Sequence, residues 1–422
     1  LLLDSTSGTK QGDVERDIKE NADAIKVFKE KQQHQRLARL ERALLVCESI
    51  LELCEGKDEE ETLAKSAKFL GTVLLLSPGS GKKLPELHQR LKPAYKAVLS
   101  LRLVDTLMQE RKVQHKYLVT HYDHATRYDS SDPSNIRDTL LFPIMFAALF
   151  QDIGMHHPDA QLILRGDTGE LDPYRVLEVD ERKQMLKITY QQTIEYLNHG
   201  LGILEYVGNS RDERDTFEHS QNAALTFCKG MLRDTIKPVH GIGEIIKIPQ
   251  IYASVVLSTK RNYAVSDLPK ACILIERMAE KGTINKQVVK HFVTLVGHFP
   301  QGFGIAYIPA NEQDGEIDRY EYAIVNTLCP ENLYEPTCRV VTRKLTFISS
   351  GQNSTIKKDQ NMYFDGVRKQ MAKVDSARLQ RILEKLQHNF ASEGSDDIVP
   401  DCWQAHDYFL QKAHQNLWNK AQ

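Results

Sequence analysis

The spacing of hydrophobic residues changes at Gly302, and this change constrains the fold more than any other feature of the sequence. Before Gly302, apolar residues recur three and four positions apart, the spacing of helices that bury one face. After it, the stretches 303–308, 320–325 and 339–347 are rich in β-branched and aromatic residues and are separated by turn-forming residues. The helical spacing returns from 377 to 390. This order predicts a mainly α fold with a small antiparallel β appendage and C-terminal helices.

The length of the chain allows several structural units. With 422 residues and about 150 residues per domain, two to four units are expected. We predict the following four ranges: an N-terminal helical domain at 1–115, a central helical domain at 116–302, the β appendage at 303–360 and the C-terminal helices at 361–422. A chain of this size can bury a hydrophobic core, so it needs neither a metal nor a disulfide in order to fold.

The first long helix contains a heptad pattern. Asp13 is expected to cap this helix, which continues to Cys54. Its apolar residues alternate in steps of three and four and form a seam: Leu37, Leu40, Leu44, Cys47, Leu51 and Cys54. Such a seam packs either on its own domain or on a second copy of the chain. The second alternative makes the protein a dimeric scaffold.

Charge and cysteine content exclude several classes of protein. The 55 basic and 57 acidic residues give a net charge of −2, which argues against coating a nucleic-acid polymer. The seven cysteines include no C-x-x-C pair and are typical of reduced thiols in a cytosol. No apolar run approaches the roughly 18 residues that a membrane span requires. We therefore expect a cytoplasmic protein without a membrane partner.

One segment in the central region is a candidate metal site. Met145–Met155 is an apolar helix that ends in Asp152, with histidines before and after it. The candidate metal ligands are His121, His124, Asp152, His156, His157 and His219. Imidazole and carboxylate groups bind divalent transition metals such as Fe or Mn, which generate a nucleophilic hydroxide and polarise phosphoryl oxygens. The alternative is that no metal binds, that Asp152 accepts structural hydrogen bonds, and that the histidines lie on the surface or in the core.

The same segment carries a family resemblance. It resembles the HD superfamily of metal-dependent phosphohydrolases, in which the corresponding stretch reads A-A-L-L-H-D-I-G-K. Residues 243–302 look like the region after the GYP motif of HD-GYP proteins, and the strands after Gly302 resemble the β tail of that family. The resemblance covers roughly 116–348 and implies an HD-type helical bundle. It also implies bacterial signalling and the hydrolysis of cyclic di-GMP with two or three metal ions.

The residues that should carry this activity are mostly replaced. Gln151 stands at the His of the HD pair, whereas Asp152 is retained as the candidate catalytic residue. Tyr196 stands at the next His, and an amide or a phenol is a poor substitute for an imidazole ligand. His124 fits the opening His better than His121 does. His219 is the nearest remnant of the block that precedes GYP.

These departures lead to three functional predictions. The first is an HD-GYP-related signalling protein with a degenerate phosphodiesterase centre that acts by binding a ligand or a protein. The ligand would be a cyclic dinucleotide or another phosphorylated small molecule. The second is an active metal-dependent phosphohydrolase whose site is rearranged around Asp152 and the five histidines. The third is the dimeric scaffold formed through the N-terminal helices.

Overall fold

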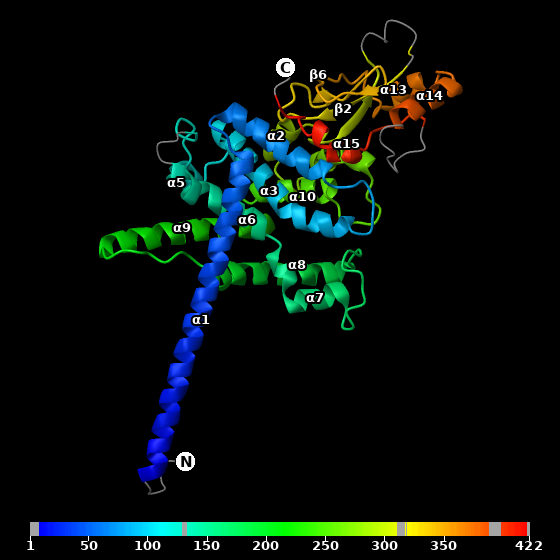
Figure 1. The fold of residues 1–422 in the computed structure, drawn as a ribbon. Coiled ribbons are helices and arrows are strands. Elements are labelled where there is room, and N and C mark those ends of the chain that lie inside the picture. The colour runs from blue at the N-terminus through cyan, green and yellow to red at the C-terminus, as the bar shows by residue number, and fades with distance from the viewer. Residues whose placement is uncertain (1–7, 129–132, 310–316, 318, 388–397, 420–422) are drawn as a thin grey trace.

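The computed structural model describes residues 8–128, 133–309, 317, 319–387 and 398–419. The fold is mainly helical and carries one small antiparallel sheet, as the spacing of apolar residues predicts (Figure 1). A single long helix, α1, projects from one side of a body that the other helices build around a central helix, α3. The sheet and the C-terminal helices lie together at the opposite end of the molecule from the tip of α1.

Helix α1 (Gly8–Cys54) begins at least five residues before the predicted cap, so Asp13 lies inside the helix. Its C-terminal part packs on the body, and Leu40, Cys47, Leu51 and Cys54 of the heptad seam are buried there. The seam therefore packs against its own chain, the first of the two alternatives. A dimer interface built on these four side chains would require them to leave the core.

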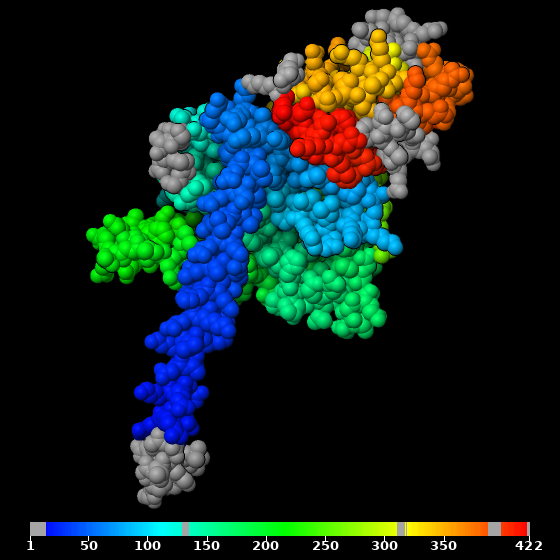
Figure 2. All heavy atoms as spheres, viewed as in Figure 1, coloured from blue at the N-terminus to red at the C-terminus, as the bar shows by residue number. Residues whose placement is uncertain are grey.

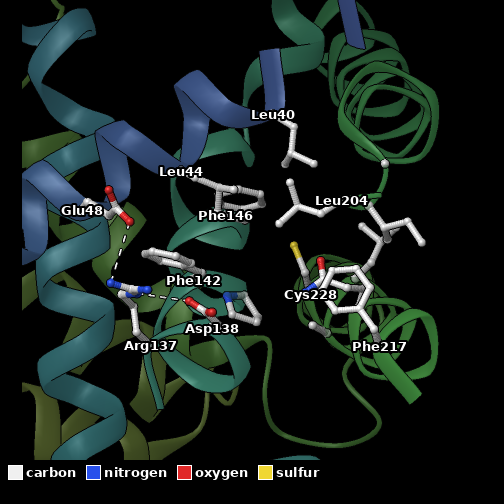
Figure 3. A pocket seen from close by; sticks show the side chains of 16 residues that line it. Leu40, Leu44, Glu48, Arg137, Asp138, Phe142, Phe146, Leu204, Phe217 and Cys228 are labelled. Carbon is white, nitrogen blue, oxygen red and sulfur yellow. Dashed lines mark hydrogen bonds and ion pairs between the residues drawn. The ribbon is translucent and has the colours of Figure 1, made fainter. Parts of the chain in front are cut away.

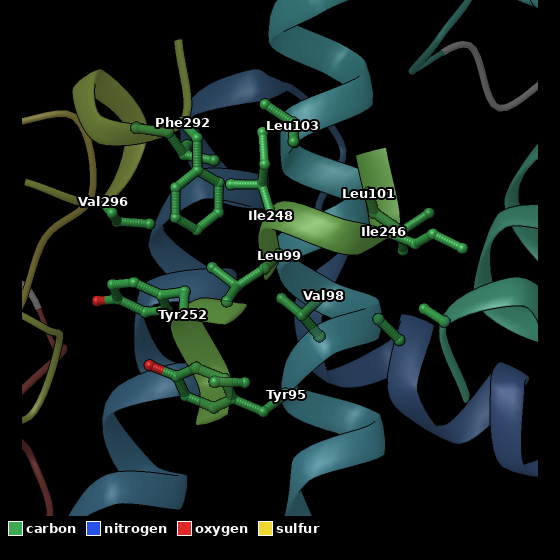
Figure 4. Close-up of a cluster of buried hydrophobic side chains, with 14 of the residues drawn as sticks. Tyr95, Val98, Leu99, Leu101, Leu103, Ile246, Ile248, Tyr252, Phe292 and Val296 are labelled. Carbon is green, nitrogen blue, oxygen red and sulfur yellow. The ribbon is translucent and has the colours of Figure 1, made fainter. Parts of the chain in front are cut away.

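Helix α3 (Leu84–Gln109) is the centre of the body. Its residues from Tyr95 to Val104 are buried on every side, because α6 (Phe142–Phe150), α10 (Glu244–Val256) and α12 (Lys286–Val296) surround it. Figure 4 shows part of this core, in which the side chains of α3 meet those of α10 and α12. Pro93 lies in the first half of α3 without ending the helix.

A group of four charges connects the end of α1, helix α3 and the segment around residue 127. Arg102 and Asp105 lie on α3, Glu55 follows the last turn of α1, and Arg127 follows the short helix α4 (Lys116–His121). Arg127 lies 2.8 Å from Asp105 and 2.9 Å from Glu55, and Arg102 contacts the same two carboxylates. The side chains of the two arginines are only 1% and 3% exposed. The group is neutral overall, as buried charges require.

The predicted boundary at residue 115 does not separate two cores. One continuous hydrophobic cluster includes residues of α1, α2 (Glu59–Leu75) and α3 together with residues of the central helices. The reason is the position of α3, whose apolar residues cover its whole circumference and thus need partners from both predicted units. The N-terminal helices and the central helices form one body.

The remaining helices of the body run in the order of the chain. Their bounds are α5 (Pro133–Ile136), the π-helix η1 (Arg137–Leu141), the 3-10 helix η2 (Ile153–His156), α7 (Pro158–Arg165), α8 (Val179–Glu195), the π-helix η3 (Tyr196–Leu201), α9 (Arg211–Ile236), the 3-10 turn η4 (Val265–Asp267) and α11 (Lys270–Glu280). Helix α9 extends sideways from the body, and α7 and α8 lie side by side below it (Figure 1).

One stretch, Arg137–His156, is by length and composition apolar enough to cross a membrane, so the expectation that no run approaches this length was wrong. Half of its most apolar window is buried inside the body. The stretch includes α6, which packs between α3 and α9. The core helix of a water-soluble protein has the same composition, and the burial of this one fits that role.

The sheet contains the strands β1 (Gly304–Tyr307), β2 (Glu321–Val325), β3 (Thr337–Val340) and β6 (Asn353–Thr355), all antiparallel and in this order. A separate pair, β4 (Thr342–Arg343) and β5 (Thr346–Phe347), lies beside it. The predicted stretches 303–308 and 320–325 contain β1 and β2, and the stretch 339–347 is divided among the end of β3, β4 and β5. Strand β6 lies outside the three predicted stretches, in a polar segment without β-branched or aromatic runs.

The C-terminal helices share a core with the sheet. They are α13 (Asp365–Met371), α14 (Ser376–Gln387), α15 (His406–Leu410) and the 3-10 turn η6 (Lys412–His414). A second hydrophobic cluster joins residues of β1 and β2 to residues of α13, α14 and α15. The backbone N–H of Trp403 donates to the carbonyl of Gly304, 3.0 Å away. The predicted units 303–360 and 361–422 therefore pack as one.

Candidate functional site

Asp152 lies where α6 ends and η2 begins. Two donors reach its carboxylate from other helices. Lys96 Nζ, from α3, lies 2.7 Å from Asp152 Oδ2, and Gln250 Nε2, from α10, lies 3.0 Å from Oδ1 and 3.3 Å from Oδ2. Gln151, which stands at the His position of the family motif, has its Oε1 3.4 Å from the same Lys96 nitrogen.

The ion pair with Lys96 determines the electrostatics of this site. The Lys96 side chain is 1% exposed and that of Asp152 is 38% exposed. A buried ammonium group requires a counter-ion, and Asp152 supplies it. The ammonium nitrogen lies against the carboxylate oxygen that a bound metal ion would need. Asp152 thus makes the contacts of a structural acceptor, the alternative that the sequence leaves open.

A second lysine lies one turn earlier on α3. Burial, together with repulsion from Lys96, lowers the pKa of Lys92 from 10.5 to about 8. The unfolded chain therefore binds more protons than the folded chain between about pH 8 and pH 10.5, and this residue makes stability rise with pH through that window. Below the window, the buried charge of Lys92 destabilises the fold in full.

We expect Lys92→Met to be more stable than the wild type at pH 7 by on the order of 2 kcal/mol. This difference should shrink as the pH rises from about 8 to about 10, because wild-type Lys92 then loses its charge. Urea unfolding of both proteins at several pH values measures it. Lys68→Met, at an exposed position of α2, serves as the control. A difference between Lys92→Met and the wild type that stays constant with pH would contradict the assignment.

The first two candidate histidines lie near α4. His121 ends this helix, and its ring centroid lies 4.4 Å from that of Tyr117. His124 is exposed in the turn that follows. No hydrogen bond or ion pair between either residue and Asp152 occurs in the described part of the chain.

The other three histidines have separate surroundings. His157 precedes α7 and caps it, because its Nδ1 accepts a hydrogen bond from the Asp159 N–H, 3.3 Å away. His156 is exposed at the end of η2. His219 is exposed on α9 and lines a pocket together with His115 and His240.

The five histidines and Asp152 do not form the shared metal site that the sequence predicts. Among the residues that the structure describes, no three side chains of His, Cys, Asp or Glu are grouped in a way that could hold a metal ion. The physical reason is that His124, His156 and His219 point to solvent, while Asp152 is held by Lys96 and Gln250.

A pocket with basic walls lies on another part of the body. It is formed by η2, α7, α8, Gln89 of α3 and the segments 173–177 and 259–260. Its basic residues are His156, Arg165, Arg175, Arg182 and Lys260, and Tyr174 also lines it. No acidic side chain is among the described residues of its wall, although Arg175 is paired with Glu181 at 2.7 Å. We call this cavity the basic pocket; its charge suits an anionic ligand.

A second pocket has mainly apolar walls. It lies between α1, α6 and α9 and has a volume of about 270 Å³ (Figure 3). Phe142, Phe146 and Cys228 face it. Arg137 is the one arginine or lysine among the described residues of its wall, and it lies 3.1 Å from Asp138 and 3.8 Å from Glu48. With its charges paired in this way, the pocket offers no free cation to a phosphate group.

Comparison of the chain with protein-family models, with curated proteins and with solved structures finds no match.

Proposed function

We propose that this chain is an HD-GYP-related bacterial signalling protein of HD-type architecture that acts by binding, with a degenerate phosphodiesterase centre. The observation that carries this proposal is the ion pair between Lys96 and Asp152 at the end of α6. In an active centre of this family, the same carboxylate would be a metal ligand. Here a buried ammonium group neutralises it, and Gln151 stands where an imidazole would be needed.

The test of this part of the proposal is metal analysis of protein purified without chelators. We expect less than one tightly bound transition-metal ion per chain and no turnover of cyclic di-GMP when Mn²⁺ or Fe²⁺ is added. Two tightly bound metal ions per chain, together with turnover that Asp152→Ala abolishes, would sink the proposal. That result would instead establish the phosphohydrolase with a rearranged site.

The basic pocket supports a phosphorylated small molecule as the ligand. Arg165, Arg182 and Lys260 line it from three different segments, so a ligand that carries two phosphate groups can contact more than one cation. Tyr174 adds an aromatic ring, the kind of surface on which a nucleobase stacks. A cyclic dinucleotide has both features.

We expect Arg165→Ala and Arg182→Ala each to weaken the binding of cyclic di-GMP about tenfold, since each removes a charge-assisted contact of about 1.5 kcal/mol. Isothermal titration calorimetry at low ionic strength measures the affinity. Lys187→Ala is the matched control, because Lys187 lies on α8 but not in the wall of the pocket. Equal losses in all three variants, or no binding by the wild type, would exclude this ligand from the pocket.

A further inference from the structure

The N-terminal part of α1 extends away from the other helices of the described chain. We define the arm as residues 14–32, every one of which is exposed. Figures 1 and 2 show the arm extending from the body as a single helix. The first tertiary contact beyond it is that of Gln33, whose Nε2 donates to Glu205 at 2.5 Å. Helices in proteins owe most of their stability to the packing of an apolar face, and the body supplies no such packing to the arm.

The arm carries an apolar stripe. At 100° per residue, Val14, Ile18, Ile25 and Phe28 fall within about 80° of one another around the helix. Each of these side chains is between 48% and 63% exposed. Their spacing is that of the a and d positions of a coiled coil, with Asn21 at the d position between Ile18 and Ile25.

This stripe is separate from the seam that α1 buries in the body. Phe28 and Leu37 are nine residues apart, which interrupts the alternation of three and four. The interruption rotates the stripe of the arm by roughly 80° from the buried seam. The body therefore cannot cover the stripe by a simple extension of the packing that buries Leu40 and Cys47. The stripe therefore stays exposed in the described chain and is a candidate interaction surface.

The charges beside the stripe indicate which molecule can bind there. On one flank, the e positions are Glu15, Ala22 and Lys29. On the other flank, the g positions are Asp17, Ala24 and Lys31. Both flanks therefore run from an acid through an alanine to a lysine over fourteen residues. Each flank is complementary to itself when a second copy runs in the opposite direction.

We propose that the arms of two copies of this chain pair as an antiparallel coiled coil centred on Asp23. In this register Glu15 faces Lys29 of the partner subunit and Asp17 faces Lys31 of the partner subunit, which gives four ion pairs per dimer. The apolar layers are then Ile18 with Phe28 of the partner subunit. Asn21 lies opposite Ile25 of the partner subunit, and this polar residue weakens the dimer because its amide has no polar partner in that layer.

A parallel pair fits the sequence less well. In a parallel coiled coil, each g position faces the e position five residues later on the other helix. Asp17 would then face Ala22, and Ala24 would face Lys29. Only Glu15 would meet a lysine, Lys10 at the preceding g position, which gives two ion pairs per dimer instead of four. The antiparallel register also separates the two bodies, because the paired segment from Val14 to Gln32 is about 27 Å long.

Charge reversal tests the register. We expect the double variant Lys29→Glu, Lys31→Glu and the double variant Glu15→Lys, Asp17→Lys each to dissociate at least about tenfold more readily than the wild type. The reason is that in each variant all charged residues on both flanks have the same sign, so facing residues repel each other. An equimolar mixture of the two variants should recover the dimer, since every facing pair is again of opposite sign. Sedimentation equilibrium of the full chain measures the dissociation constants of the wild type, of each double variant and of the mixture.

The matched control is Lys19→Glu, Lys26→Glu, which makes the same charge change at b positions outside the interface. It should dimerise like the wild type. A wild type that remains a monomer up to about 200 μM overturns the proposal, since even a weak dimer with a Kd near 100 μM would be visible there. Charge-reversed variants that dimerise as tightly as the wild type overturn it as well.

A crosslink reports the direction of pairing independently of affinity. In the antiparallel register, Ala24 lies beside Ala24 of the partner subunit, so Ala24→Cys should form a disulfide-linked dimer on oxidation. In a parallel pair Ile25→Cys would crosslink instead, because a positions face each other. Both variants are made in a Cys329→Ser background, since Cys329 is the exposed cysteine of the chain. Efficient crosslinking of Ile25→Cys and not of Ala24→Cys would contradict the proposal.

Discussion

We expect the replacement of Asp152 with Ala to lower the free energy of unfolding by about 3 kcal/mol. The variant leaves the ammonium group of Lys96, whose side chain is 1% exposed, without its counter-ion. The loss stays at the lower end of the range for buried pairs because the Asp152 side chain itself is 38% exposed. Chemical denaturation at pH 7 measures this effect, and Asp159→Ala, at an exposed position of α7, is the control.

A double variant separates the structural role of Asp152 from a metal-binding role. Lys96→Met combined with Asp152→Asn removes both charges and keeps the amide contact with Gln250 possible. We expect it to regain most of the stability that Asp152→Ala loses, because a neutral pair requires no counter-ion. If Asp152 were instead a metal ligand, removing the charge of Lys96 would not restore the stability that is lost with Asp152. An Asp152→Ala variant as stable as the wild type would show that the ion pair with Lys96 does not stabilise the fold.

Glu55→Ala should destabilise the body more, by about 3–5 kcal/mol. Glu55 contacts both Arg102 and Arg127, so its removal leaves two buried guanidinium groups with only Asp105 to neutralise them. Denaturation followed by circular dichroism measures the change. The control is Glu52→Ala, because Glu52 is exposed one turn earlier on α1 and should lie within about 0.5 kcal/mol of the wild type.

The outcome for Glu55→Ala also bears on the domain boundary. If 1–115 were an independent unit, the loss of Glu55 would weaken only that unit, and a second transition would remain unchanged. Because Arg127 and the helices around α3 belong to the same core, we expect the main unfolding transition itself to shift to lower denaturant. Two transitions, of which only one shifts, would favour the boundary at 115.

The sequence was sufficient for the elements whose signal is local. The strands near 304–307 and 321–325 follow from runs of β-branched and aromatic residues, and the C-terminal part of α1 follows from the heptad spacing between Leu37 and Cys54. The prediction that Asp13 caps the helix was wrong, because an aspartate can occupy an interior helical position as well as a cap position. Strand β6 was missed because Asn353–Thr355 is polar and exposed and is ordered by pairing with β3.

The partners of Asp152 depend on contacts between distant residues. Lys96 is 56 residues away in the sequence and Gln250 is 98 residues away, so no local spacing connects them with Asp152. A signal for Lys96 was nevertheless present. A lysine between Tyr95 and Ala97, inside an apolar helical run, is seldom fully buried unless it is paired. In a sequence, every acid that ends a buried helix is a candidate ion-pair partner for such a lysine.

Helix α1 is one unbroken rod from the arm to the core. It contains neither glycine nor proline between Asp13 and Cys54, so it has no built-in hinge. Its 47 residues span about 70 Å, of which about 40 Å lie outside the body. A displacement of the tip by roughly 4 Å is then a tilt of only about 6° where α1 enters the body. Because a tilting rod moves least near its fixed end, the residues of α1 inside the body are displaced little. Two copies can therefore join their tips while the Glu55 charges and the basic pocket keep their geometry.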